Sequence, residues 1–251
     1  MAFRFLPLVC LLLLGFAPDD ERPALPVTDT TDATIKAYTE GESRAPYFVQ
    51  LHDKPVAGQF WETGSDSYDI DSSTRWQVSK LDGRVAIVEQ QLKVDAEMFK
   101  SDYVLAYRVN LDAEAGTPNV TKAWIGKPGE DPTEITVQEA PADIEQPKDK
   151  PAEDLDETIE DFAAIKLGGG TWAGKLYTRV YGKEISQVWI ASEGWFGGII
   201  KVTAGDYTNQ LRAFGTDAEP ILKLPADILK DSTPKEDPKD VPGDGEPAKD
   251  D

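Results

Sequence analysis

The only histidine of the sequence, His52, is the residue best suited to activating a nucleophile. Asp53 follows it, and such a pair could activate a serine hydroxyl at Ser65, Ser67 or Ser192. The chain has no G-x-S-x-G turn that would present a serine in this way. Neighbouring residues of a strand also point to opposite faces, which works against a hydrogen bond between the two. We therefore interpret the histidine as a surface residue and predict no catalytic residue.

Metal and phosphate sites lack the residues that they need. Cys10 is the only cysteine, which excludes a disulfide within the chain and a cysteine-based zinc site. Residues 66–73 (DSYDIDSS) offer oxygen atoms of the kind that Ca²⁺ prefers, but they lack the spacing of an EF-hand loop. Residues 168–170 are three glycines outside any phosphate-binding motif. The sequence therefore predicts no metal and no cofactor, a solvated loop at 66–73 and a turn at 168–170.

Aromatic side chains are the remaining candidates for contact with a ligand. The six tryptophans all lie in two segments that we predict to be rich in strands, and residues 195–196 (WF) lie in a predicted loop between two glycines. Tryptophan rows on a sheet face can bind sugars or lipids, although their large apolar area more often places them in a core. The ligand-contact candidates are Trp61, Trp76, Trp124, Trp172, Trp189, Trp195 and Phe196.

The elements that must position these residues are strands. Apolar residues alternate with polar ones through residues 46–137 and 161–230, and Gly and Asp-Gly turns separate the runs. The pattern predicts a mostly all-β fold, a strongly curved antiparallel sheet or open barrel, with a short helix near residues 220–231 as an option. Two tandem small β domains are the alternative. The expected strands are 47–51, 56–63, 74–80, 84–93, 103–111, 120–127, 162–167, 172–181, 184–191, 198–203 and 209–214.

The two blocks also resemble each other. Trp61 and Trp76 are 15 residues apart, and Trp172 and Trp189 are 17 residues apart. In each block a short apolar run follows, residues 85–88 in the first and 199–202 in the second. This spacing predicts two related halves, each a hairpin followed by a further strand.

Charge and composition set the domain boundaries. Residues 1–17 have Arg4 and then an apolar run too short to span a bilayer, which is typical of a signal peptide. The net charge is −20, and most of it falls in segments 18–45, 138–160 and 231–251, which we predict to be an acidic disordered segment, a Pro-rich linker and a disordered tail. So acidic a chain argues against nucleic acid as a partner. We expect a secreted or periplasmic protein with no integral membrane span in the mature chain.

Residues 189–215 resemble a W-x-S…GG-x-x-K…L-x-x-F-G pattern of secreted bacterial proteins with a curved antiparallel sheet, similar to lipoprotein carriers. The residues that carry the resemblance are Trp189, Ser192, Gly197, Gly198, Lys201, Leu211, Phe214 and Gly215. The resemblance implies that the concave face holds acyl chains.

Three functions stay open at this point. The first is an exported non-enzymatic binding module for an apolar or acyl ligand or an envelope protein. The second is a structural or assembly component of the cell envelope without a small ligand. The third is a carboxylate-dependent hydrolase, because nothing among the 46 Asp and Glu residues singles out or excludes a catalytic pair.

Overall fold

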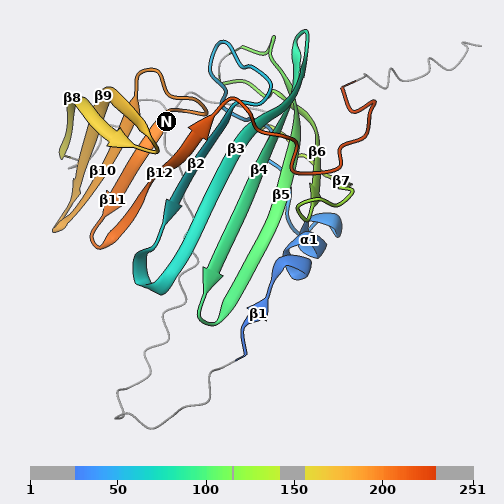
Figure 1. The fold of residues 1–251 in the computed structure, drawn as a ribbon, viewed down its shortest axis with the longest axis horizontal. Coiled ribbons are helices and arrows are strands. Elements are labelled where there is room, and N and C mark those ends of the chain that lie inside the picture. The colour runs from blue at the N-terminus through green and yellow to red at the C-terminus, as the bar shows by residue number, and fades with distance from the viewer. Residues whose placement is uncertain (1–25, 115, 142–155, 230–251) are drawn as a thin grey trace, which may run out of the picture.

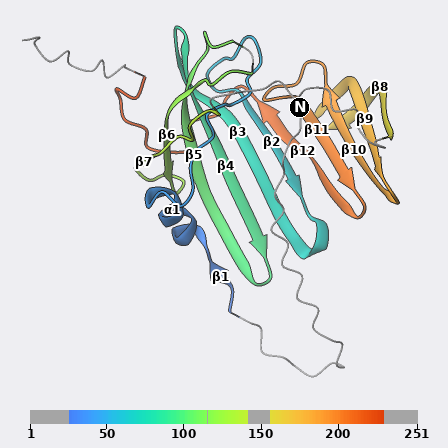
Figure 2. The ribbon, with the colours of Figure 1, turned by 180° about the vertical axis from the view of Figure 1, so that it is seen from behind.

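A single open sheet of twelve strands dominates the structure. The computed structural model describes residues 26–114, 116–141 and 156–229. Their strands form one mostly antiparallel sheet that does not close on itself, as Figure 1 and Figure 2 show. The sheet confirms the predicted fold class. The predicted signal segment 1–17 and tail 231–251 lie outside the described residues.

The first run of strands goes up and down in sequence order. Each strand pairs antiparallel with the next one, so six consecutive strands lie side by side. The predicted turn at Asp82-Gly83 is confirmed, because Gly83 has a positive φ of 55° between two of these strands. The strands are β2 (Phe60–Ser65), β3 (Ile70–Asp82), β4 (Val85–Ala96), β5 (Phe99–Asn110), β6 (Val120–Gly126) and β7 (Thr133–Ile135).

The second run joins the first edge to edge. Its last strand pairs antiparallel with β2, with Phe214 opposite Trp61, so the two meanders share one sheet rather than forming separate domains. Residues 156–160, which we assigned to the acidic linker, belong to its first strand, while residues 142–155 lie outside the described part. The strands are β8 (Asp156–Leu167), β9 (Gly170–Tyr181), β10 (Glu184–Ala191), β11 (Ile199–Ala204) and β12 (Tyr207–Gly215).

The acidic segment 18–45 corrects one prediction. We expected it to be disordered, but its described part contains strand β1 (Thr28–Asp29), which pairs parallel with β5, and helix α1 (Thr31–Thr39). Ile35 and Tyr38 pack from the helix against the sheet, and this contact stabilises a segment of low overall hydrophobicity. Within the described residues, no helix is long and apolar enough to cross a membrane.

Two further elements differ from their predictions. Residues 47–51 form no strand, and Asn119, just before β6, binds them instead. Its Oδ1 accepts a hydrogen bond from the backbone N–H of Val49 at 2.8 Å, and its Nδ2 donates one to the Val49 carbonyl at 2.8 Å. Residues 220–229 contain turns and no helix. Pro220 and Pro225 lack the N–H groups that a helix interior needs.

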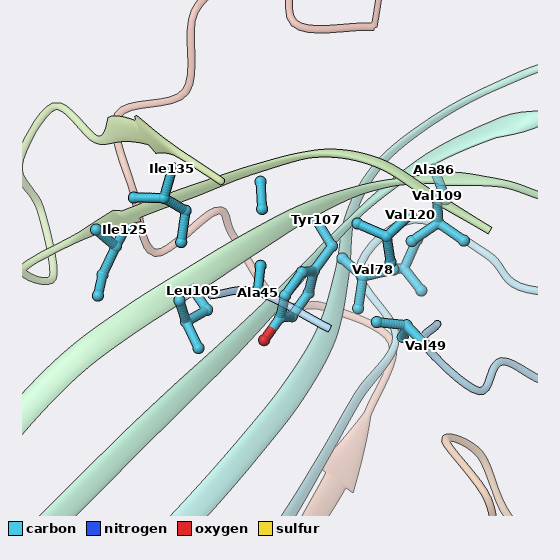
Figure 3. Close-up of a cluster of buried hydrophobic side chains, with 12 residues drawn as sticks. Ala45, Val49, Val78, Ala86, Leu105, Tyr107, Val109, Val120, Ile125 and Ile135 are labelled. Carbon is cyan, nitrogen blue, oxygen red and sulfur yellow. The ribbon is translucent and has the colours of Figure 1, made fainter. Parts of the chain in front are cut away.

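Two apolar clusters cover opposite faces of the first run. On one face, α1 and residues 45–51 cover buried side chains that include Val78, Leu105 and Tyr107 (Figure 3). On the other face, the segment 218–229, which we call the C-terminal strap, covers Ile87 and its neighbours. Strands β4 and β5 are therefore buried on both faces over much of their length. The second cluster consists of Ile87, Val104, Ala106, Trp124, Leu222 and Ile228.

Candidate functional site

An aromatic cluster lies where the two runs of strands meet. Trp61 on β2 is opposite both Trp76 on β3 and Phe214 on β12, so the three share a face of the sheet. Trp172 on β9 reaches the same place, with ring centroids 5.0 Å from Trp61 and 4.9 Å from Phe214. Trp61 is 2% exposed and donates a hydrogen bond from Nε1 to the carbonyl of Ile199. Edge-to-face ring packing of this kind fills the space as a core does.

The loop at residues 192–198 completes this cluster. Trp195 has its ring centroid 6.0 Å from Phe214, and Phe196 stacks on Trp76 at 6.2 Å. Phe196 has φ of 49°, and the two glycines after it also have positive φ. A non-glycine residue in this region carries strain that its surroundings must hold in place. The side chains of Trp195 and Phe196 thus face the core, and only part of their surface is exposed.

His52 lies against the same loop and not in a catalytic arrangement. Its ring stacks on Trp195 at 5.9 Å and meets Phe196 edge-on at 6.1 Å. Nε2 is 2.9 Å from Oε1 of Gln59, and no hydrogen bond joins it to Asp53. Burial lowers the pKa of the imidazole, although the hydrogen bond with Gln59 opposes the shift. The surface histidine that the sequence predicted is in fact half-buried.

The two remaining tryptophans, Trp124 and Trp189, have different surroundings. Trp124 is buried under the C-terminal strap and faces no open surface. Trp189 on β10 is half-buried, and the ammonium group of Lys201 lies over its ring, 5.0 Å from the centroid. The structure thus brings Trp61, Trp76, Trp172, Trp195 and Phe196 together, packs Trp189 against the buried core that includes Trp61, and leaves Trp124 elsewhere.

A row of apolar side chains, which we call the apolar row, crosses the second run of strands. Ile159 on β8 is opposite Tyr177 on β9, which is opposite Val188 on β10, which is opposite Val202 on β11. Residues directly opposite in neighbouring strands share a face of the sheet. Ile159 is 55% exposed, and the other three are half-buried. Four strands at about 4.8 Å spacing give the row a length of roughly 14 Å.

On β8 and β9, the apolar row and the aromatic cluster lie on opposite faces of the sheet. Phe162 and Trp172 pack with the cluster, and they are three and five residues from Ile159 and Tyr177 along stretches without a register shift. The turn between β8 and β9 packs against β12, since a Cβ atom on Gly168 would lie only 2.9 Å from Cγ of Leu211. Of the three predicted turn glycines, Gly168 and Gly169 form this turn and Gly170 begins β9. The apolar row is therefore a surface separate from the aromatic cluster.

No sequence pattern identifies the most deeply buried carboxylate among the described residues. Glu89 on β4 is 0% exposed and accepts hydrogen bonds from Gln77 and Ser79 on β3. It also accepts bonds from the backbone N–H groups of Ile221 and Leu222, both at 2.8 Å. The carboxylate thus attaches the C-terminal strap to the sheet. The strap covers it, so it is not accessible to a substrate.

The loop predicted at 66–73 is wrong beyond Asp69, because β3 begins at Ile70, and an arginine binds two carboxylates of this segment. The guanidinium group of Arg212 lies 2.7 Å from Asp71 and 3.6 Å from Asp66. In the described part of the chain, no group of three or more Asp, Glu, His or Cys side chains is placed to hold a metal ion. The ion pairs of Asp66 and Asp71 with Arg212 connect β3 and the segment before it to β12.

Comparison with known proteins adds no family assignment. No protein-family model matches the chain, and no curated protein matches its sequence. The function therefore has to be argued from the apolar row, the aromatic cluster and their surroundings.

Proposed function

We propose that the protein is an exported, non-enzymatic binding module that takes an apolar or acyl ligand on an uncovered face of its curved sheet. The observation that carries the proposal is the apolar row Ile159, Tyr177, Val188 and Val202. No described helix, loop or strap covers these four side chains as α1 and the C-terminal strap cover the first run. Uncovered apolar side chains in a continuous row are typical of a binding surface.

Burial supplies the affinity in this proposal. Apolar contact contributes about 25 cal/mol per Å² of area removed from water. A ligand that lies along the apolar row covers half-exposed surface on four strands. Export rests on the signal-like segment 1–17, whose charge and apolar run have the pattern of a secretory leader.

Binding of a dansyl-labelled C11 fatty acid tests the proposal. The probe should become brighter and shift to the blue with the purified protein, and Val188→Asp should abolish this by placing a charge in the apolar row. Ile185→Asp is the matched control, because Ile185 lies on the same strand, is 53% exposed and points to the opposite face. Equal binding by both variants, or no binding by the wild type, would contradict the proposal.

A structural or assembly role is the second candidate, and the aromatic cluster favours it. Five of the aromatic side chains predicted to contact a ligand pack on one another instead, as in a core. The binding proposal therefore rests on the apolar row alone. Failure of every apolar probe, together with co-purification of the protein with an envelope component, would support this second role.

A further inference from the structure

Strand β8 is an open edge of the sheet. It is the last strand in the sheet order, and among the described strands only β9 pairs with it along its length. The unpaired N–H and C=O groups of such an edge are a template for another strand. The opposite edge is different, because β7 has only three residues and Val137, just after it, bridges to Ala45.

The first part of β8 is a regular template. Residues 156–162 pair with residues 180–174 of β9 without a shift in register. The register shifts only between Phe162 and Ile165, where Ala164 has φ of 60°. A bulge of this kind bends the strand away and limits pairing beyond it. The regular part has about the length of an ordinary strand, so a partner strand of similar length fits it.

The charge on this edge selects a basic partner. Glu157 and Asp161 pair with Arg179 and Lys175 of β9, whereas Glu160 has no ion-pair partner among the described residues. Residues 156–162 carry four acidic side chains and no basic one. A second copy of this chain, with a net charge of −20, would be repelled. A cationic segment would be attracted and steered toward the edge.

Exposed apolar surface on the same strand defines the rest of the partner. Ile159 ends the apolar row and is the most exposed large apolar side chain in β8, since no further strand lies beside it. A strand added there would place a side chain opposite Ile159 and cover it. We infer that residues 156–162 bind an extended segment of a partner protein, with alternating basic and apolar side chains, by strand addition.

A synthetic peptide of alternating lysine and valine tests this inference by calorimetry with the purified protein. The peptide should bind, and hydrogen exchange should slow at residues 156–162. The same peptide with N-methyl groups on alternate residues keeps its charge but loses the N–H groups that would pair with the edge. It should bind at least about tenfold more weakly, since strand addition draws its affinity from main-chain hydrogen bonds. Equal binding of the two peptides would overturn the inference.

Two matched charge reversals locate the peptide. Glu160→Lys should weaken binding about fivefold or more at low salt, because it reverses a charge on the docking strand. Asp206→Lys changes the net charge equally, but it lies exposed in the turn between β11 and β12 and should change binding less than about twofold. Equal losses would mean non-specific attraction and overturn the inference. Val188→Asp should leave peptide binding intact, so this test and the fatty-acid test fail independently.

Discussion

The two runs of strands share one sheet but are stabilised differently. In the first run, β4 and β5 have consecutive buried residues, because α1 with residues 45–51 covers one face and the C-terminal strap covers the other. In the second run, β10 and β12 have mainly half-buried side chains, and each has a single buried residue, Ala191 and Leu211. The first run is a packed scaffold, and the second presents side chains to its surroundings.

This difference explains where a binding surface can lie. A side chain buried on a scaffold strand cannot reach a ligand without unfolding its neighbours, as with Trp124 under the strap. A ligand can contact the side chains of the apolar row by covering them, without any unfolding of the sheet. Strand pairing with β2 connects this exposed part rigidly to the packed part, and the aromatic cluster packs across that connection.

Two glutamates give the sharpest form of the comparison. Glu89→Ala should destabilise the protein by about 4 kcal/mol, because it leaves two side chains and two backbone N–H groups without their buried acceptor. Glu160→Ala in the exposed β8 should change the free energy of unfolding by less than about 0.5 kcal/mol. Urea unfolding of both variants measures this. Similar values would show that the strap contributes little to the scaffold.

Two valines compare the runs without any change of charge. Val88 is 0% exposed between covered strands, and Val188 is half-buried in the apolar row. Val88→Ala should cost about 2 kcal/mol from lost burial and the cavity left behind, and Val188→Ala less than about 1 kcal/mol. Equal costs in urea unfolding would mean that the second run is covered as well as the first, against the proposed binding surface.

The sequence predicted the scaffold strands well because their alternation is strong. The strand expected at 84–93 is β4, and the one expected at 103–111 is β5, which begins four residues earlier. The polar strand ends carry no apolar signal, so the predicted strands were too short. Residues 47–51 have strand-like residues, yet one asparagine side chain takes the place of a neighbouring strand. That contact is long-range, and no local pattern contains it.

The candidate site was less predictable than the fold. The tryptophans were identifiable by type, but which of them pack together depends on β12 returning to β2. The apolar row is invisible in the sequence, because its four residues come from four strands and meet only through register. Glu89 looks like any other of the many acidic residues until the C-terminal strap is placed over it.

The tyrosines of the scaffold predict a loss of stability at high pH. Burial raises the pKa of Tyr103 to about 12, and it also raises the pKa of Tyr107 well above its usual value. The folded state therefore keeps protons that the unfolded state loses above pH about 10. The free energy of unfolding should fall between pH 10 and about 12. Tyr103→Phe should make the fall of the unfolding free energy with pH less steep, and Tyr107 should account for the fall that remains. A slope identical to that of the wild type would contradict the assignment.

His52 predicts a smaller change at acidic pH, at the connection between the two runs. Burial against Trp195 and Phe196 holds its pKa below the value of about 6.5 that it has in the unfolded chain. Its contribution to stability is thus complete above pH 6.5 and is lost as the pH falls through the lower folded pKa, because the unfolded state binds the proton first. The effect should be modest, since the ring is only half-buried and the hydrogen bond with Gln59 opposes the shift. His52→Phe keeps an aromatic ring in this place but cannot titrate, so its unfolding free energy should vary less between pH 7 and 5 than that of the wild type. If the two slopes agree, the histidine is solvated in the native protein and does not connect the packed run to the exposed one.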